Sequence, residues 1–314
     1  MAGRPIVVMG VFVADLAFLT PKLPAWGETV LGLSFKMGPG GKGSNQAIAA
    51  ARLGGTVSFI SKVGRDAFGD IARRTYAEEG VDTRFLFEST EHATGGAAII
   101  VDAVKGDNAI VVFPGACAHL ALEEIDKAQP AIADAAIFMT NLELPVPVVM
   151  YGLKLARRLG VKTVLNPAPA VPVPEEIFAL CDYLTPNETE AAGLTGMPVA
   201  SVDDALRAGE ALMARGAANV VITLGGRGAL IRGEDITRHA PAVEAGDLMD
   251  STGAGDAFCG AFAVALAEGK TLDAATRYGC TAAGIQVTRW GTAPAMPRRA
   301  EVEALTAKLN ASSA

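Results

Sequence analysis

One acidic side chain stands close to the expected start of a helix. Residues 250–258 read DSTGAGDAF, and the strongly helical segment Cys259 to Glu268 follows directly. Glycine lets the backbone approach a ligand closely, and the free N–H groups at a helix N-terminus, together with the helix dipole, attract an anion such as a transferring phosphoryl group. We therefore predict an anion-binding site at the start of this helix.

Asp256, inside that segment, has two interpretations. It could simply cap the helix, a position that short polar and acidic residues favour. A carboxylate beside an anion hole would repel an arriving phosphate, however, so stability alone would favour Ser or Thr there. In phosphoryl transfer the nucleophile loses its proton late, so a carboxylate with an ordinary pKa of about 4 can still orient an alcohol and accept its proton. A catalytic base is the better explanation of Asp256.

A second glycine-rich stretch, GPGGKGSNQ at residues 38–46, has the spacing of a dinucleotide-binding loop but not its context. The acid that would bind a ribose about 20 residues later is missing, since Ser61 and Lys62 stand there. A Walker A loop is excluded as well, because glycine follows Lys42 where Ser or Thr is required. The stretch is interpreted as a polar loop leading into a helix, with Lys42 and Asn45 free to hydrogen-bond hydroxyl groups.

Two further polar groups follow predicted strands. Asn187 and Glu190 lie three residues apart, so on a helix that begins here they share one face and could position a hydrated Mg²⁺ through its water molecules. The alternative is a capping box, in which the same two residues only stabilise the helix start. The segment Thr223 to Gly228, TLGGRG, could form a nest of backbone amides for nucleotide phosphates, or simply a turn.

Short β-branched segments alternate with Ala- and Leu-rich helical segments through most of the chain. This alternation is typical of βα units and a mainly parallel sheet. Ligands of such sheets bind beyond the carboxyl ends of the strands, where we therefore expect the chemistry. The predicted strands cover residues 6–9, 56–61, 137–140, 163–165 and 220–223, and the predicted helices cover residues 45–53, 70–79, 146–159 and 259–268.

Two segments interrupt this alternation. Residues 29–37, and residues 96–104 with 109–113 after a turn at 105–108, have the pattern of paired strands with no helix between them. They could form a small antiparallel sheet that covers an active site, or two hairpins at the edge of the main sheet. The sequence alone leaves both arrangements open.

The composition favours a small-molecule substrate. The 314 residues include 27 Lys and Arg against 34 Asp and Glu, a formal net charge of −7, so no positive field attracts nucleic acid or anionic lipid. The most apolar helical run, Ala257 to Ala267, is shorter than the roughly 20 residues that span a bilayer, and the N-terminus has no signal-peptide pattern. Four well-separated cysteines and only three histidines indicate reduced thiols in a cytoplasmic protein, without a histidine-rich metal centre.

Taken in order along the chain, these segments resemble the ribokinases of the PfkB family of carbohydrate kinases. The resemblance covers nearly the whole chain. The motifs that carry it are GVFVAD at 10–15, GGKGSNQA at 40–47, GRDAFGD at 64–70, NLELP at 141–145, NPAPA at 166–170, TPNETEA at 185–191, ITLGGRG at 222–228, DSTGAGDAF at 250–258 and VTRWGTAPAMP at 287–297.

The resemblance implies a fold and an activity. The fold would be a ribokinase-like three-layer α/β/α domain with a mainly parallel central sheet, at residues 1–11, 39–95 and 114–314. A small β-sheet lid, at residues 12–38 and 96–113, would close over the sugar and pair with the lid of a second copy in a homodimer. The activity would be transfer of the γ-phosphoryl group of ATP to a primary hydroxyl of a small carbohydrate, with D-ribose as the expected sugar.

The resemblance also implies roles for individual residues. The sugar hydroxyls would be held by Asp15, Gly41, Lys42, Asn45 and Glu143, and Asp256 would be the base beside the anion hole at Gly253, Ala254 and Gly255. The phosphates of ATP would be lined by Asn187, Thr223, Gly225 and Gly228, with Glu190 near Mg²⁺. An activating K⁺ would be bound, mainly through carbonyl oxygens, at Asp250, Thr252, Gln286, Arg289, Gly291 and Ala295.

Two positions depart from the family pattern. Ala295 stands where ribokinases commonly offer a serine hydroxyl to K⁺, which could weaken that site. Val13 stands where they usually have Asn, two residues before Asp15, and the loss of an amide that reads a hydroxyl could shift the preferred sugar. The alternatives are therefore a kinase for another pentose, a hexose such as fructose or ketogluconate, or a nucleoside such as adenosine. A nicotinamide-dependent oxidoreductase and a non-catalytic sugar sensor are the alternatives from other classes.

Overall fold

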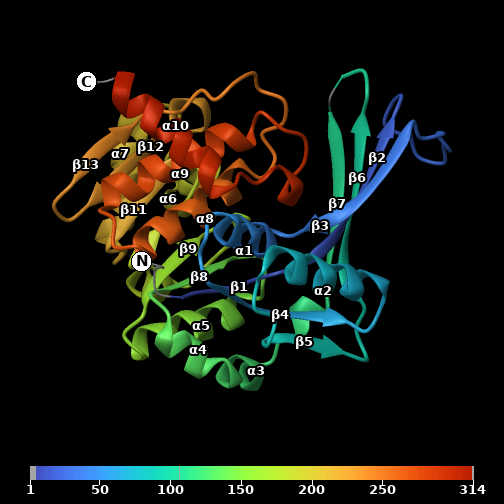
Figure 1. Ribbon diagram of the computed structural model, residues 1–314, viewed down its shortest axis with the longest axis horizontal. Coiled ribbons are helices and arrows are strands. Elements are labelled where there is room, and N and C mark those ends of the chain that lie inside the picture. Colours follow the sequence, from blue (N-terminus) through green and yellow to red (C-terminus); the bar gives the residue numbers. More distant parts are fainter. Residues whose placement is uncertain (1–4, 106, 313–314) are drawn as a thin grey trace.

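The strands of the chain pair into two separate sheets (Figure 1). The computed structural model describes residues 5–105 and 107–312, and within them one sheet has nine strands and the other has four. The first four residues of the predicted core, the predicted turn residue Gly106 and the last two residues lie outside the described part. No helix in that part is long and apolar enough to cross a membrane.

The larger sheet is mainly parallel, as predicted. Its strand order is β13-β12-β11-β10-β9-β8-β1-β4-β5, with antiparallel pairing only where β12 and β13 follow β11. The strands are β1 (Ile6–Met9), β4 (Val57–Gly64), β5 (Leu86–Ser89), β8 (Ile137–Asn141), β9 (Lys162–Asn166), β10 (Tyr183–Leu184), β11 (Asn219–Thr223), β12 (Ala229–Gly233) and β13 (Thr237–Ala240).

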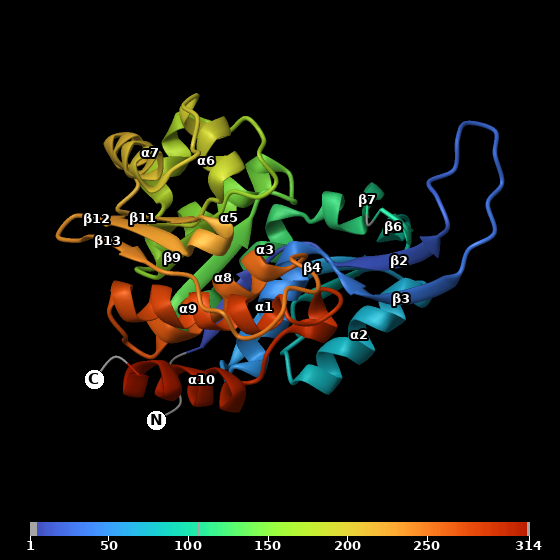
Figure 2. The same ribbon diagram turned by 90° about the horizontal axis from the view of Figure 1, so that it is seen from above.

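Helices cover both faces of this sheet, so the fold has three layers (Figure 2). Successive side chains of a strand point to opposite faces, and in β1 Val7 and Met9 pack into one hydrophobic core while Ile6 and Val8 pack into another. The first core includes α3 (Leu122–Lys127), α4 (Gln129–Asp134), α5 (Val146–Arg158), α6 (Glu188–Thr195) and α7 (Val202–Ala214). The second includes α1 (Lys42–Arg52), α2 (Ala67–Glu79), α8 (Ala254–Ala267), α9 (Leu272–Gln286) and α10 (Arg299–Ser312).

The smaller sheet projects from one end of the molecule (Figure 1). Its strands are β2 (Val13–Thr20), β3 (Ser34–Gly40), β6 (Thr94–Asp102) and β7 (Asn108–Gly115), in the order β3-β2-β6-β7. The central pair, β2 and β6, is parallel, so the prediction of an antiparallel sheet is wrong for this pair. The four strands form a sheet of their own, so the alternative of two hairpins on the main sheet is wrong as well.

Two boundaries in this region also differ from the sequence prediction. The strand expected from residue 29 begins only at Ser34, and β2 was not predicted. The parallel partner of β2 lies far along the chain, and such non-local pairing leaves no pattern in the local sequence. In the main body, α1 begins at Lys42 rather than Asn45, which places Lys42 on the first turn of the helix.

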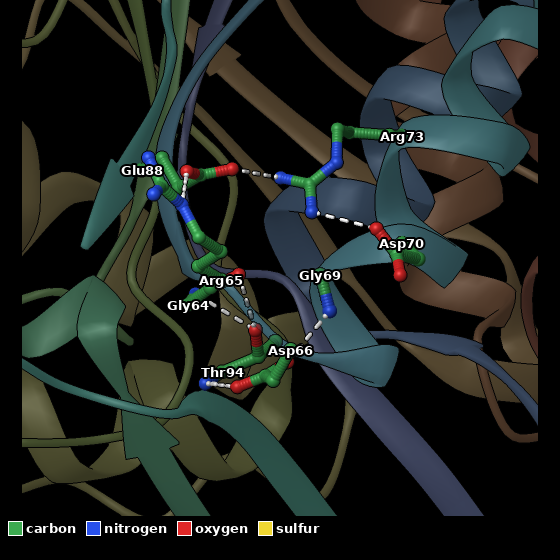
Figure 3. Close-up of polar contacts among 8 residues, drawn as sticks. All are labelled: Gly64, Arg65, Asp66, Gly69, Asp70, Arg73, Glu88 and Thr94. Atoms are coloured by element: carbon green, nitrogen blue, oxygen red, sulfur yellow. Dashed lines mark hydrogen bonds and ion pairs between the residues drawn. The ribbon is translucent and has the colours of Figure 1, made fainter. Parts of the chain in front are cut away.

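The loop between β4 and α2 fastens the small sheet to the main body (Figure 3). One carboxylate oxygen of Asp66 accepts a hydrogen bond from the backbone N–H of Gly69 (2.9 Å) and caps α2. The other accepts from the backbone N–H of Thr94 (2.7 Å), the first residue of β6. The helix predicted from Asp70 therefore begins earlier, at Ala67, and a single carboxylate joins a core helix to the small sheet.

Helices α1 and α8 lie unusually close together. A Cβ atom on Gly260 would lie 2.6 Å from the Cβ of Ala49 and 2.8 Å from the backbone oxygen of Gln46, distances that real Cβ atoms do not reach. Only glycine therefore permits this approach. The approach brings Asn45 and Gln46 of α1 within hydrogen-bond distance of Asp256 on α8.

Replacing Gly260 with alanine should separate the two helices and lower the free energy of unfolding by about 1–3 kcal/mol. Chemical denaturation measures this change. The matched control is Gly193→Ala on α6, where the added Cβ would meet only the Cβ of Ala170 at an ordinary 3.7 Å. Because alanine is the better helix former, we expect the control to be neutral or stabilising by up to about 1 kcal/mol. Equal effects of the two substitutions would contradict the close approach.

Candidate active site

A pocket of about 180 Å³ opens where the carboxyl ends of β9, β10 and β11 meet the N-terminus of α8. This is the edge of a parallel sheet at which ligands bind, as the sequence predicted. The pocket is lined by Lys42, Asn166, Ala168, Thr185, Asn187, Glu190, Thr223, Ser251, Gly253, Gly255, Asp256 and Cys259. Several of the predicted site residues, which are far apart in the sequence, therefore meet in one cavity.

Asp256 lies on the first turn of α8 and does not cap the helix. The N-cap is Gly253, whose φ of 85° lies in the left-handed region that favours glycine, and no side chain caps this end. The interpretation of Asp256 as a mere cap is therefore wrong. Gly255 is exposed at the mouth of the helix, whereas the N–H of Ala254 is directed at the backbone oxygen of Ser251 (3.2 Å).

Two side-chain amides hold the carboxylate of Asp256. Asn45 donates to one oxygen and Gln46 donates to the other, each at 3.0 Å. Burial raises the pKa of Asp256, since its residue is only 5% exposed, while Lys42 and the two amide hydrogen bonds lower it. The amides therefore fix the direction of the carboxylate and favour its charged form, as a proton acceptor requires.

Lys42 is the cation of this pocket. Burial lowers the pKa of its ammonium group, but the nearby carboxylates of Asp256, Glu143 and Glu190 raise it more, so the net shift is upward. Its backbone N–H donates to the carboxylate of Glu143 at 2.8 Å. Lys42 is therefore charged and lies between the predicted base and the residues predicted to contact phosphate, whereas the sequence suggested contact with sugar hydroxyls alone.

Asp15 approaches the same region from the small sheet. An added Cβ on Gly40 would lie 2.1 Å from a carboxylate oxygen of Asp15, so the glycine leaves room for this side chain. The other oxygen lies 3.5 Å from the hydroxyl of Thr292. Burial raises the pKa of Asp15 to about 6, the Thr292 hydrogen bond opposes that shift, and the charge of Asp256 adds to it.

Two residues that received no predicted role from the sequence, Gln46 and Asn166, are connected to Asp256 in the structure. The side-chain amide of Gln46, which is fully buried, donates to Asp256 and also to the side-chain oxygen of Asn166 (3.0 Å). Asn166 in turn donates to the backbone oxygen of Thr185 (2.8 Å). Both residues lie in motifs that carry the family resemblance, Gln46 near a helix start and Asn166 at a strand end. Those positions were the signal that could have identified them. Together they connect the carboxylate of Asp256 to the backbone at the carboxyl edge of the sheet.

Asn187 and Glu190 form the capping box and also face the pocket. The Glu190 backbone N–H donates to the Asn187 side chain (2.8 Å), and the Asn187 backbone N–H donates to the Glu190 carboxylate (2.9 Å). Both side chains line the cavity. Burial raises the pKa of Glu190, and Asn187 and Lys42 lower it. The oxygen donors here suit a Mg²⁺ that keeps most of its water ligands, so the residues fit the predicted ion through water.

The predicted nucleotide residues divide into two groups. Thr223 lines the pocket, and its backbone N–H donates to Pro186 just before Asn187. Gly225 and Gly228 do not line the pocket; they lie in the turn after β11, where the Gly228 N–H donates to the Gly225 oxygen at 3.0 Å. The segment thus forms a turn, which was one of the two arrangements expected from the sequence, and Gly225 is exposed.

The comparisons with known proteins agree with this arrangement. A family model described as pfkB family carbohydrate kinase matches residues 4–299. The chain belongs to this family. A ribokinase from Haemophilus influenzae is 39% identical over 300 residues, which is 95% of this chain and 97% of the relative. A deoxyribokinase from Salmonella typhi is 36% identical over 293 residues, which is 93% of this chain and 95% of the relative.

Solved structures lead to the same family. The structure of an Arabidopsis thaliana ribokinase complexed with ribose and ATP superimposes with a TM-score of 0.90 and 30% identity, covering 97% of this chain and 99% of that chain. A ribokinase from Thermotoga maritima gives a TM-score of 0.88 at 35% identity, with 97% and 99% covered. The chain is therefore a phosphotransferase of the carbohydrate kinase family with the ribokinase fold, and this assignment replaces the nicotinamide-dependent alternative.

The carboxylate of Asp250 accepts from the backbone N–H groups of Thr252 (2.9 Å) and Gly291 (3.0 Å). The backbone oxygens of Thr252 and Gly291, two of the expected ligands, accept from the side chain of Gln286. Two of the six positions predicted to bind K⁺ are therefore already bridged by a protein side chain. Arg289 contacts Glu301 through its side chain, and Ala295 is buried.

The acids around the pocket make stability depend on pH in a defined direction. Burial and the charge of Asp256 raise the pKa of Glu143 from 4.5 to about 7, against the opposing effect of Lys42. The folded state therefore holds this proton more tightly than the unfolded state, so stability is lost as the pH rises from about 5 through 7.

Glu143→Gln removes this titration because glutamine resembles the protonated acid. Relative to the parent protein, we expect the variant to gain about 2 kcal/mol of unfolding free energy between roughly pH 5.5 and pH 8. Thermal and urea unfolding at the two pH values measure the gain. A difference between the two proteins that stays constant across this range would show that Glu143 titrates normally.

Proposed function

We propose that this chain is an ATP-dependent ribokinase, which transfers the γ-phosphoryl group of ATP to the 5-hydroxyl of D-ribose. The observation that carries the proposal is Asp256: a buried carboxylate, held by two amides, at a helix N-terminus that opens into the pocket. The ribokinase relatives, and the Arabidopsis structure described as complexed with ribose and ATP, support the choice of substrates.

Asp256 is the proton acceptor in this proposal. The primary hydroxyl of the sugar donates its proton to the carboxylate as the oxygen attacks the γ-phosphorus, and the bond between that phosphorus and the bridging oxygen of ADP breaks. The backbone N–H groups of Gly253 and Gly255 stabilise the transferring phosphoryl group, and that of Ala254 joins them when it releases the oxygen of Ser251. The helix dipole of α8 acts in the same direction. Asn45 and Gln46 keep the carboxylate oriented.

The sugar is held on the side of the pocket that faces the small sheet. Asp15, Gly41, Asn45 and Glu143 contact its hydroxyls, with Lys42 reaching both sugar and phosphate. The side-chain oxygen of Asn45 is buried and has no partner among the described residues, so it is free to accept from a hydroxyl. Residues 12–38 and 96–113 act as the lid and the rest of the chain as the core, and closure of the lid excludes water and limits ATP hydrolysis.

ATP lies along the carboxyl edge of the sheet, with its phosphates beside Asn187 and Thr223 and with Gly225 and Gly228 in the adjoining turn. Glu190 would hold Mg²⁺ through the water ligands of the ion. When bound, this ion neutralises charge on the phosphates. Lys42 adds a fixed positive charge to the same region. No role is assigned to a monovalent cation, because two of its expected ligands, the carbonyl oxygens of Thr252 and Gly291, already accept hydrogen bonds from Gln286.

A second candidate substrate is 2-deoxy-D-ribose. The relative from Salmonella typhi is named deoxyribokinase, at 36% identity. Val13 lies two residues before Asp15 in β2, on the same face of the strand, and its buried hydrocarbon side chain cannot hydrogen-bond a sugar hydroxyl. A sugar that lacks one hydroxyl loses nothing at this position.

Asp256→Asn should lower turnover by about 10²- to 10⁴-fold and leave ATP affinity within a few fold, because the amide keeps the shape but cannot accept the proton. ADP release with ribose, 2-deoxyribose, other pentoses, hexoses and adenosine measures turnover, and calorimetry measures ATP binding. Thr281→Val, on the adjacent helix α9 and equally buried, is the control that should retain activity.

The sugar panel separates the candidates. Ribose with the highest kcat/KM supports the main proposal, and 2-deoxyribose with the highest value selects the second candidate. No ADP release with any sugar, or near-normal turnover of Asp256→Asn, would overturn the kinase mechanism. Sugar binding without ADP release would point to the sensor instead.

We further propose that two copies of the chain pair through the outer face of the small sheet. The strand register places Phe18, Phe35, Met37, Val111 and Phe113 on one face, opposite to the face that carries Asp15. Each of these five side chains is at least 40% exposed. Large contiguous apolar surfaces of this kind are typical of interaction sites, and a second lid, with an identical face, is the complementary partner.

A double substitution of Phe35 and Val111 to lysine should convert a dimer into a monomer, because two charges on each copy would be buried in the interface. Light scattering after size-exclusion chromatography measures the mass. Leu122→Lys, on α3 and away from the lid, exposes a comparable side chain and should leave the mass unchanged. A monomeric parent protein, or a dimer that survives the double substitution, would contradict pairing through the lid.

A further inference from the structure

The side chain of Gln286 lies beside the loop that leads into the N-terminus of α8. Gln286 is the last residue of α9 and is fully buried. Its amide nitrogen donates to the backbone oxygen of Thr252 at 2.5 Å and to that of Gly291 at 3.1 Å. Thr252 directly precedes Gly253, the N-cap of α8, so one side chain joins the anion-hole loop to the loop after α9.

The orientation of this amide follows from its partners. Carbonyl oxygens only accept hydrogen bonds, so the group that faces the two of them must be the NH₂ and not the oxygen. The amide oxygen of Gln286 is buried and has no hydrogen-bond partner within the part of the chain that the structure describes. The side chain thus leaves its own acceptor unsatisfied while it satisfies two backbone carbonyls, which argues that those two contacts define its position.

The same two carbonyls are those that the family resemblance assigns to K⁺. A monovalent cation would supply positive charge to carbonyl oxygens and bridge the two loops. Here the partial positive charge of two N–H groups acts on the same oxygens, and Asp250 adds a second bridge through the backbone N–H groups of Thr252 and Gly291. Ala295 offers no hydroxyl to a cation. Thr252, Gly291 and Asp250 are thus all engaged in the bridge between the two loops.

We propose that the side-chain amide of Gln286 takes the place of the monovalent cation, so that the anion hole of this kinase is assembled without K⁺. Gln286 is a positioning residue: it acts through Thr252 and Gly253 and does not touch the substrates. An ideal Cβ on Gly253 would lie 3.5 Å from its amide nitrogen, so the amide packs directly beneath the helix start. The activity arm of the test rests on the proposed kinase function, and the unfolding arm does not.

The first test compares the parent protein in KCl with the same protein in tetramethylammonium chloride at equal ionic strength. We expect turnover to agree within about twofold, and the melting temperature without substrates to agree within about 1 °C, because binding of an ion to the folded state alone would raise it. Turnover at least about fivefold higher in KCl, or a melting temperature raised by several degrees, would overturn the proposal.

Two substitutions test the role of the amide itself. Gln286→Ala removes the bridge and opens space at the two carbonyls, and Gln286→Glu keeps the shape but places a carboxylate against them. Both variants should lose activity in tetramethylammonium chloride, by about tenfold or more, and regain part of it in KCl. Both should also gain about 2–4 °C in melting temperature from KCl, as a newly bound ion would produce. Thr281→Val on the same helix should respond to neither salt.

The outcomes separate this inference from the proposed function. If no sugar is phosphorylated under any condition, the melting temperatures still decide whether Gln286 replaces a cation. If Gln286→Ala keeps full activity and stability without K⁺, the amide has no positioning role and the inference is wrong. If neither variant folds, the response of the parent protein to K⁺ decides.

Discussion

The arrangement of the candidate site depends on keeping the carboxylate of Asp256 both buried and fixed in direction. Burial of a charged carboxylate is costly unless hydrogen bonds compensate for the lost water. Asn45 and Gln46 provide that compensation from α1, one to each oxygen of Asp256. They can do so only because α1 and α8 approach each other at Gly260 and Ala49. The packing of the two helices and the orientation of the Asp256 carboxylate are therefore one constraint.

The charges around Asp256 have a common logic. Asp15, Glu143 and Glu190 are all close enough to raise the pKa of Lys42 or to have their own pKa raised by Asp256, so acidic groups outnumber basic groups around the pocket. Such a pocket would repel phosphate without counter-charges. Lys42 and the N-terminus of α8 are placed to supply them.

A sequence motif locates the loop predicted to bind K⁺ but does not show which of its atoms are free. Two of the carbonyl oxygens expected to bind K⁺, those of Thr252 and Gly291, already accept hydrogen bonds from the side chain of Gln286. Gly225 and Gly228 likewise match their motif, and hydrogen bonds within the segment hold them in a turn. Motif residues identify the loops, whereas hydrogen bonds decide which atoms remain free for a ligand.

The mainly parallel sheet, the pocket at its strand ends and the place of Asp256 in that pocket could be predicted from the sequence, because hydrophobic periodicity and glycine-rich helix starts are local properties. It did not reveal β2, the anchoring of the lid by Asp66, or the links from Gln46 to Asp256 and from Gln286 to Thr252. These features join segments far apart in the chain. They follow from packing distances of a few ångströms, which only the tertiary structure decides, since no local pattern records which distant groups meet.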